Sequence, residues 1–121
     1  MEFEVVSRDE RRTIFVNNTL LKDKEISIIK LNKGKAIGGC LHNNREYYVI
    51  LSGTVEVHKK NKPIVLELEG CAGTFNPKEA HMFVAYEDSL IMEYGLTTEE
   101  KLKDKKDEEM RKEMENINSG K

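Results

Sequence analysis

Four side chains that can bind a metal ion or move a proton lie in two short stretches of this sequence. Cys40, His42 and Glu46 lie close together, and His81 follows farther along the chain. Thiolate, imidazole and carboxylate are all ligands for divalent first-row metals. On an extended strand Cys40 and His42 point to one face, and Glu46 and Tyr48 share that parity. The spacing predicts a concave group of ligands, with Tyr48 as a proton donor in the same pocket.

Short β-type runs between residues 13 and 95 supply the strands that must position these ligands. They alternate with turn residues, and helical periodicity is absent there. The predicted strands are 13–16, 25–31, 46–51, 54–58, 64–68, 81–86 and 89–94. Consecutive short strands joined by tight turns favour antiparallel pairing and closure into an all-β jelly-roll barrel, which turns one face of each strand inward.

Length and charge limit the number of domains and the classes of partner. The chain has 121 residues, which is room for one core. Lys and Arg number 20 and Asp and Glu 22, so neither nucleic acid nor an anionic membrane is an expected partner. No apolar run at either end is long enough for a signal peptide or a spanning helix. We therefore expect a cytoplasmic protein that binds a small-molecule substrate, with Cys40 and Cys71 reduced.

The sequence changes character after residue 96. A capping-box pattern begins at Thr97 and strong helix formers follow, so a helix is expected from there to about Asn118. The chain thus divides into a barrel over 1–96 and a charged helix and tail over 97–121. One narrow apolar stripe runs along the helix, at Met110, Met114 and Ile117. Either the helix docks loosely and peripherally on its own barrel, or this stripe contacts a second subunit.

The spacing of glycines around the ligands resembles the two motifs of the cupin superfamily. Every interval of the first motif, G-x5-H-x-H-x3-E-x6-G, is kept by Gly34, Cys40, His42, Glu46 and Gly53. Cys40 stands where the first His belongs. The second motif, G-x5-P-x-G-x2-H-x3-N, is kept in spacing, with its letters retained at Gly70 and His81. The resemblance covers residues 32–94 and implies a cupin jelly-roll barrel.

In metal-binding cupins the two His and the Glu of the first motif and the His of the second hold the ion. The resemblance therefore implies a divalent ion, such as zinc, iron, manganese or nickel. Its implied ligands are Cys40, His42, Glu46 and His81. A thiolate at Cys40 favours zinc over manganese. Two alternatives stay open, one in which Cys40 is a small buried hydrophobe beside a set of three ligands, and one in which the pocket is metal-free.

Cupins carry out many reactions, so the fold does not select one. The stretch D-E-R-R-T-I at 9–14 is similar to the D-x-R-G-x-L segment of cupins that isomerise or epimerise nucleotide-linked keto sugars, with Arg12 replacing the glycine. That resemblance implies that His42 removes a proton next to a carbonyl and that Tyr48 or His81 is the acid. The other classes are a metal-dependent enzyme for a small polar substrate, sugar-like or carboxylate, and a non-catalytic module that binds a sugar or an anion.

Residues outside the motifs have structural interpretations. His58 lies next to two lysines and is expected to be a solvated turn residue, while Phe75 and Phe83 are expected to fill the core. The strand at 13–16 is apolar at three of its four positions and is expected to form a sheet edge. A twofold homodimer would cover that edge, as the resemblance to small cupins also implies. The alternative is a monomer in which the helix covers the strand.

Overall fold

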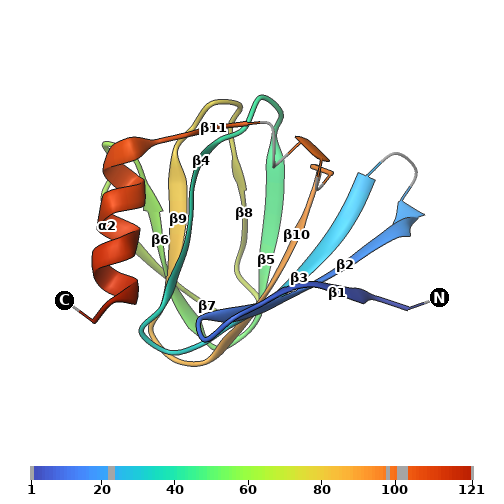
Figure 1. Ribbon diagram of the computed structural model, residues 1–121, viewed down its shortest axis with the longest axis horizontal. Coiled ribbons are helices and arrows are strands. Elements are labelled where there is room, and N and C mark those ends of the chain that lie inside the picture. Colours follow the sequence, from blue (N-terminus) through green and yellow to red (C-terminus); the bar gives the residue numbers. More distant parts are fainter. Residues whose placement is uncertain (1, 22–23, 98, 101–103, 121) are drawn as a thin grey trace.

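Two antiparallel β-sheets form the body of the molecule, and the C-terminal helix α2 (Glu108–Asn118) lies against them (Figure 1). The computed structural model describes residues 2–21, 24–97, 99–100 and 104–120. All pairings between the described strands are antiparallel. The predicted all-β class with a C-terminal helix is therefore confirmed.

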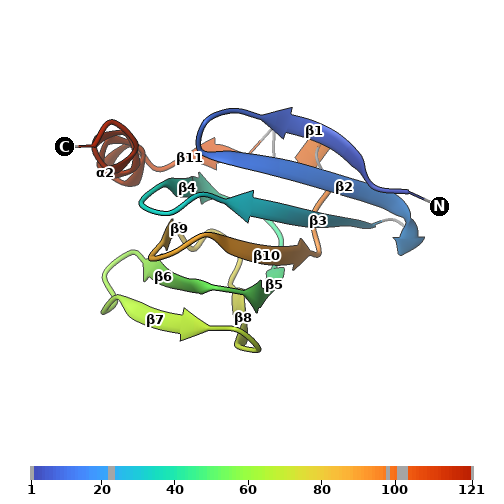
Figure 2. The ribbon, with the colours of Figure 1, turned by 90° about the horizontal axis from the view of Figure 1, so that it is seen from below.

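The strands divide into a six-stranded and a five-stranded sheet. In spatial order the first contains β1 (Glu4–Arg8), β2 (Arg12–Leu21), β3 (Lys24–Leu31), β10 (Ser89–Tyr94), β5 (Glu46–Ser52) and β8 (Ala72–Phe75). The second contains β11 (Lys105–Lys106), β4 (Ala36–Leu41), β9 (His81–Ala85), β6 (Thr54–Lys59) and β7 (Val65–Leu68). Helix α2 (Glu108–Asn118) lies at the end of the molecule opposite the N-terminus (Figure 2). In the described part of the chain, no helix combines the length and apolar character needed to span a bilayer.

Alternation along the strands explains how the core is filled. In β3 alternate side chains are buried, including Ile29 and Leu31, as expected where one face of a sheet lies on a core. Strand β9 differs, because all five of its residues are buried. Phe83 joins the core between the sheets, while Met82 and Val84 on the other face belong to a cluster with residues of α2. Strand β9 is thus covered on both faces and carries His81 at its start.

Helix α2 begins at Glu108, later than the predicted start at Thr97. The intervening chain is not one continuous helix, because β11 pairs with the end of β4 before α2 starts. Strand pairing here overrides the helix-forming composition. The capping box is nevertheless formed, since Thr97 and Glu100 exchange two hydrogen bonds between side chain and backbone, each of 3.1 Å. Thr98 and residues 101–103 of the predicted helix lie outside the described residues.

The apolar stripe of α2 packs on the barrel of its own chain. Met110 and Met114 are buried, and Ile117 packs against the cluster that contains Met114 and the outward side chains of β9. The helix docks on its own barrel, as the first interpretation has it, but the predicted loose docking is wrong, because Met110 and Met114 are buried. The interpretation of the stripe as a contact with a second subunit is wrong, because β4 and β9 already cover it.

Four strands were missing from the sequence prediction, namely β1, β4, β8 and β11. Glycine weakens the strand pattern in β4 and β8. Strand β1 matters for the subunit argument, because it pairs with β2 and places β2 in the interior of the sheet. The predicted edge at 13–16 is therefore wrong. The homodimer stays a prediction that has lost this support.

Helix α2 also changes the environment of His58. This residue lies in β6 and is buried, with its Nε2 3.0 Å from Glu56 Oε1 and its Nδ1 3.8 Å from Glu113 Oε1 of α2. The prediction of a solvated turn residue is wrong, because the helix covers this part of β6. Phe75 and Phe83 are each 1% exposed, so their predicted place in the core is confirmed.

We expect the substitution Asp107→Ala to destabilise the docked helix. The Asp107 carboxylate accepts a hydrogen bond from the Met110 N–H at 3.0 Å and another from Lys60 Nζ at 2.6 Å. Losing such an N-cap lowers the free energy of unfolding by about 0.5–2 kcal/mol. Urea unfolding measures the change, and Asp107→Asn, which keeps the cap, should lose less. An unchanged free energy in the alanine variant would contradict the capping role.

Candidate metal centre

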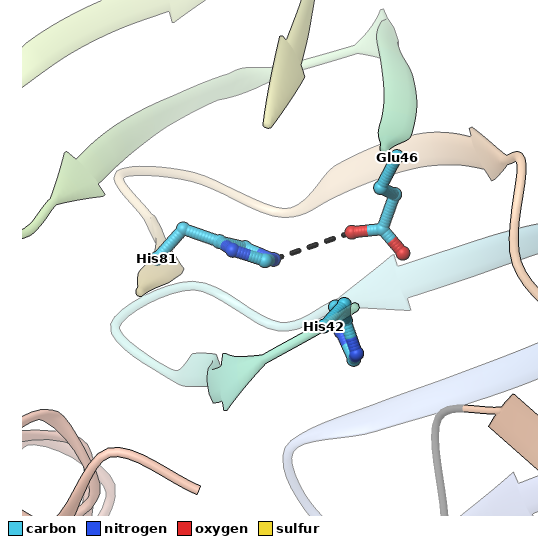
Figure 3. A group of neighbouring side chains, drawn as sticks. All are labelled: His42, Glu46 and His81. Atoms are coloured by element: carbon cyan, nitrogen blue, oxygen red, sulfur yellow. Dashed lines mark ion pairs between the residues drawn. The ribbon is translucent and has the colours of Figure 1, made fainter. Parts of the chain in front are cut away.

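Three ligand side chains converge inside the barrel. His42 follows β4, Glu46 begins β5 and His81 begins β9. Figure 3 shows Glu46 and His81 pointing toward one another, with His42 beside them. One ligand atom from each residue lies within 4.8 Å of the others, and all three residues are buried. The predicted convergence of these residues is confirmed.

Three neighbouring groups hold the His81 imidazole. Its Nδ1 donates to the Glu79 carbonyl oxygen at 2.9 Å, which leaves Nε2 facing Glu46 Oε1 at 3.2 Å. The Phe75 ring stacks on the imidazole, with ring centroids 3.7 Å apart. Burial opposes protonation, but the Glu46 carboxylate and the Glu79 carbonyl outweigh it and raise the pKa of His81 above its ordinary value. A metal ion at this position would replace that proton.

Asp104 orients His42, and the sequence analysis missed it. Its Oδ2 accepts a hydrogen bond from His42 Nδ1 at 2.8 Å, and its Oδ1 accepts one from the Asn43 amide at 3.1 Å. A carboxylate can only accept here, so Nδ1 carries the proton and His42 Nε2 is left as a ligand or base. Asp104 is 62 residues beyond His42 in a run of charged residues, so no local pattern marks it.

The three ligand side chains line a cavity of about 310 Å³. Its apolar wall consists of Ile14, Ile29, Ile37 and Phe83. Three cationic side chains also line it, namely Arg12 of β2, Lys106 of β11 and Arg111 of α2. The C-terminal segment, which the sequence predicts to be peripheral, therefore contributes directly to the site.

Known proteins were compared with this chain in sequence and in structure. No family model matches the sequence, and no curated protein matches it. A solved cupin superfamily protein from Desulfitobacterium hafniense superposes with a TM-score of 0.65 at 12% identity, over 76% of this chain and 83% of that chain. This chain has the cupin fold.

Two further solved structures share this cupin fold. KdgF from a Halomonas species superposes with a TM-score of 0.64 at 17% identity, over 78% of this chain and 85% of that chain. A match among the DMSP lyases RdDddP and RnDddQII has a TM-score of 0.62 at 15% identity, over 72% of this chain. The chain described here covers only 48% of that lyase chain. At these identities the likeness is in the fold.

Cys40, at the remaining cupin ligand position, lies outside the ligand group. It lines the cavity, but its sulfur is not one of the ligand atoms that lie within 4.8 Å of one another. Burial raises the pKa of the Cys40 thiol, which disfavours the thiolate that metals bind. The geometry favours the alternative in which Cys40 is a small, half-buried hydrophobe beside three ligands.

A shift in the register of β4 sets the direction of Cys40. The pairing of β4 with β9 shifts register between Gly38 and Cys40, so Ile37 and Cys40 line the same cavity although they are three residues apart. Gly38 has a φ of 123°, and a Cβ there would lie 2.7 Å from the His81 carbonyl oxygen. Glycine therefore permits the close approach of β4 to the backbone that carries His81.

Tyr48 has the predicted inward direction but not the predicted place in the pocket. Its hydroxyl donates to the Glu67 carboxylate, with oxygen distances of 2.8 and 2.9 Å, and its ring stacks on Phe75. It is absent from the described residues that line the cavity. Burial and the Glu67 carboxylate raise the pKa of Tyr48, so the phenol keeps its proton. Strand parity predicts only the face of the sheet on which the Tyr48 side chain lies. The position of its hydroxyl is set by the hydrogen bond to Glu67 of β7.

The donor set suits a divalent ion. Two imidazoles and one carboxylate are common ligands of zinc, iron, manganese and nickel. In both His42 and His81 the Nδ1–H group donates a hydrogen bond to an oxygen acceptor, as the non-ligating N–H of metal-binding histidines does. The residues present therefore fit the ion that the cupin motifs imply.

We expect the substitution Asp104→Ala to weaken metal binding about 10- to 100-fold, because His42 loses the acceptor that fixes its ring. Asp104→Asn keeps an oxygen acceptor and should weaken binding less. Competition with a chromophoric chelator measures the affinity. Equal affinities for the wild-type protein and the alanine variant would contradict the positioning role of Asp104.

Proposed function

We propose that this cupin is a metal-dependent enzyme that acts on a small polar substrate. The buried group of His42, Glu46 and His81 inside the cavity carries the proposal. A divalent ion held by these three side chains would supply Lewis-acid activation of water, oxygen or a chelating substrate. One solved chain with this fold comes from a study of DMSP lyases, so the fold is compatible with a catalytic role.

The protein's own groups prepare this site. Asp104 and the Glu79 carbonyl accept hydrogen bonds from Nδ1 of His42 and Nδ1 of His81. Both Nε2 atoms are therefore available as ligands. The apolar wall of the cavity lowers the local dielectric and strengthens the interactions of the polar groups inside it. These features together favour an ordered, partly dry site over an exposed surface group.

The size of the cavity bears on the alternative of a nucleotide-sugar isomerase. A volume of about 310 Å³ lies at the lower end of the roughly 300–1,000 Å³ typical of ligand sites. A small substrate fits this space better than a nucleotide-linked sugar does. The position of Tyr48 outside the cavity also removes one of the two candidates for the acid in this alternative and leaves His81.

Elemental analysis of the purified protein tests the proposal. We expect about one divalent ion per chain, removed by a chelator and restored by adding zinc, iron(II), manganese or nickel one at a time. The restoring ion should also raise the melting temperature, because it binds only the folded chain. A protein that carries no ion, and that none of the four stabilises, would overturn the proposal and favour the metal-free alternatives.

A further inference from the structure

Three cations line the cavity together with the ligand group. Glu46 and Glu93 line the cavity, and Asp104 binds His42. A divalent ion would neutralise much of this negative charge. The cations that also line the cavity, Arg12, Lys106 and Arg111, would then face an electropositive centre. Such a cavity attracts a negatively charged ligand.

Arg12 shows the clearest need for a partner. Its Nε is buried and has no hydrogen-bond partner among the described residues. The neighbouring Arg11 takes the Asp9 carboxylate, through Nε at 3.1 Å and a terminal nitrogen at 2.7 Å. Burial and the charges of Arg11 and Arg111 lower the pKa of Arg12. A buried guanidinium nitrogen without a partner costs free energy, and an anion in the cavity would supply the missing acceptor.

The Arg111 side chain extends from α2 to the same cavity. It lies on α2, and its side chain passes over Gly39 of β4, where a Cβ would come within 2.8 Å of Arg111 Cδ. A terminal nitrogen of Arg111 is 3.4 Å from the Gly38 carbonyl oxygen. Gly38 and Gly39 therefore make room for a cation from the helix. Two guanidinium groups, from β2 and α2, thus border one space.

We propose that this cavity binds a small organic carboxylate, held at its anionic end by Arg12 and Arg111. Guanidinium groups match the planar geometry of a carboxylate, and Ile14 and Ile29 on the apolar wall can receive the carbon part of the ligand. The inference deepens the proposed function by naming its substrate class. Recognition by arginine does not itself require the metal ion, so the two proposals can fail separately.

The test measures calorimetric binding of malonate, malonamide and inorganic phosphate to the chelator-treated, full-length protein. Malonamide has the size of malonate without its charge. We expect malonate to bind and malonamide to bind at least about 10-fold more weakly, because a charge-assisted hydrogen bond contributes roughly a tenfold factor or more. Equal binding of malonate and malonamide would overturn the proposal. Tighter binding of phosphate than of malonate would overturn the choice of a carboxylate.

Two matched substitutions locate the contact. Arg12→Gln should weaken malonate binding about 10- to 100-fold, while Arg11→Gln, one residue away and paired with Asp9, should leave it unchanged. Arg111→Gln provides a second variant if Arg12→Gln unfolds, and should weaken binding about 10-fold. Unchanged malonate affinity in a folded Arg12→Gln or Arg111→Gln variant would overturn the assignment.

Metal content is the separate readout. Elemental analysis should give the same metal content for Arg12→Gln and the wild-type protein, because Arg12 is not a ligand. Malonate binding that depends on Arg12 in a protein that takes up no metal would support the carboxylate site and overturn only the metal-dependent function. A protein that takes up metal but binds no malonate, before or after metal loading, would overturn the carboxylate site alone.

Discussion

The substitution His81→Ala should lower metal affinity by more than about 100-fold. This loss exceeds the roughly 10- to 100-fold effect of removing an outer hydrogen-bond partner, because a direct ligand disappears. His81 supplies one of the three ligand atoms that lie within 4.8 Å of one another. The change also removes the His81 Nε2 that lies 3.2 Å from the buried Glu46 carboxylate. Elemental analysis and chelator competition measure the effect.

His58→Ala is the matched control for this substitution. His58 is another buried histidine with a carboxylate partner, but it lies under α2 and outside the ligand group. Its replacement should affect stability and leave the metal content unchanged. If His81→Ala retained the metal content of the wild-type protein, or if His58→Ala lost as much metal, the assigned centre would be wrong.

The substitution Phe75→Ala should lower the free energy of unfolding by about 3–5 kcal/mol, the usual cost of truncating a buried phenylalanine. Phe75 is 1% exposed and stacks on both Tyr48 and His81. Its loss opens a void beside a ligand, so the His81 ring should become less fixed. Metal affinity should therefore fall together with stability, as measured by urea unfolding and chelator competition.

A pair of leucine variants separates these two effects. Phe75→Leu and Phe83→Leu remove similar volume from the same cluster, but only Phe75 stacks on His81 among the described ring contacts. Both should lose stability, and Phe75→Leu should lose more metal affinity. Equal affinities in the two variants would mean that the Phe75 stack does not position His81.

The ligand group was predictable because its members are set by local spacing on strands. His42, directly after β4, and Glu46, at the start of β5, are four residues apart, and the interval pattern with His81 marks another strand of the same barrel. Strand parity also gave the correct inward face of Tyr48. It could not give the partner of the Tyr48 hydroxyl, because Glu67 approaches from a different sheet.

The positions of Lys106 and Arg111 at the cavity, and of Asp104 beside His42, could not be predicted from the sequence. Residues 97–121 have the composition of a solvated helix, and composition does not show that Lys105 and Lys106 pair with β4. That pairing brings Asp104 to His42 and Arg111 to the cavity. The unpredicted part of the site thus depends on a contact between distant segments, and the same holds for β1, which removed the predicted edge of β2.

The position of Asp104, Lys106 and Arg111 after the last barrel strand has a consequence for biosynthesis. A ribosome releases the chain from its N-terminus, so the strands from β1 to β10 emerge before these three residues do. A nascent barrel holds His42, Glu46 and His81 before it holds the carboxylate that orients His42 or the arginine of α2. Capture of a metal ion in the final geometry would therefore wait until residues 104–111 have left the exit tunnel, and a chain that stalls before then would hold the three ligands without Asp104 and Arg111.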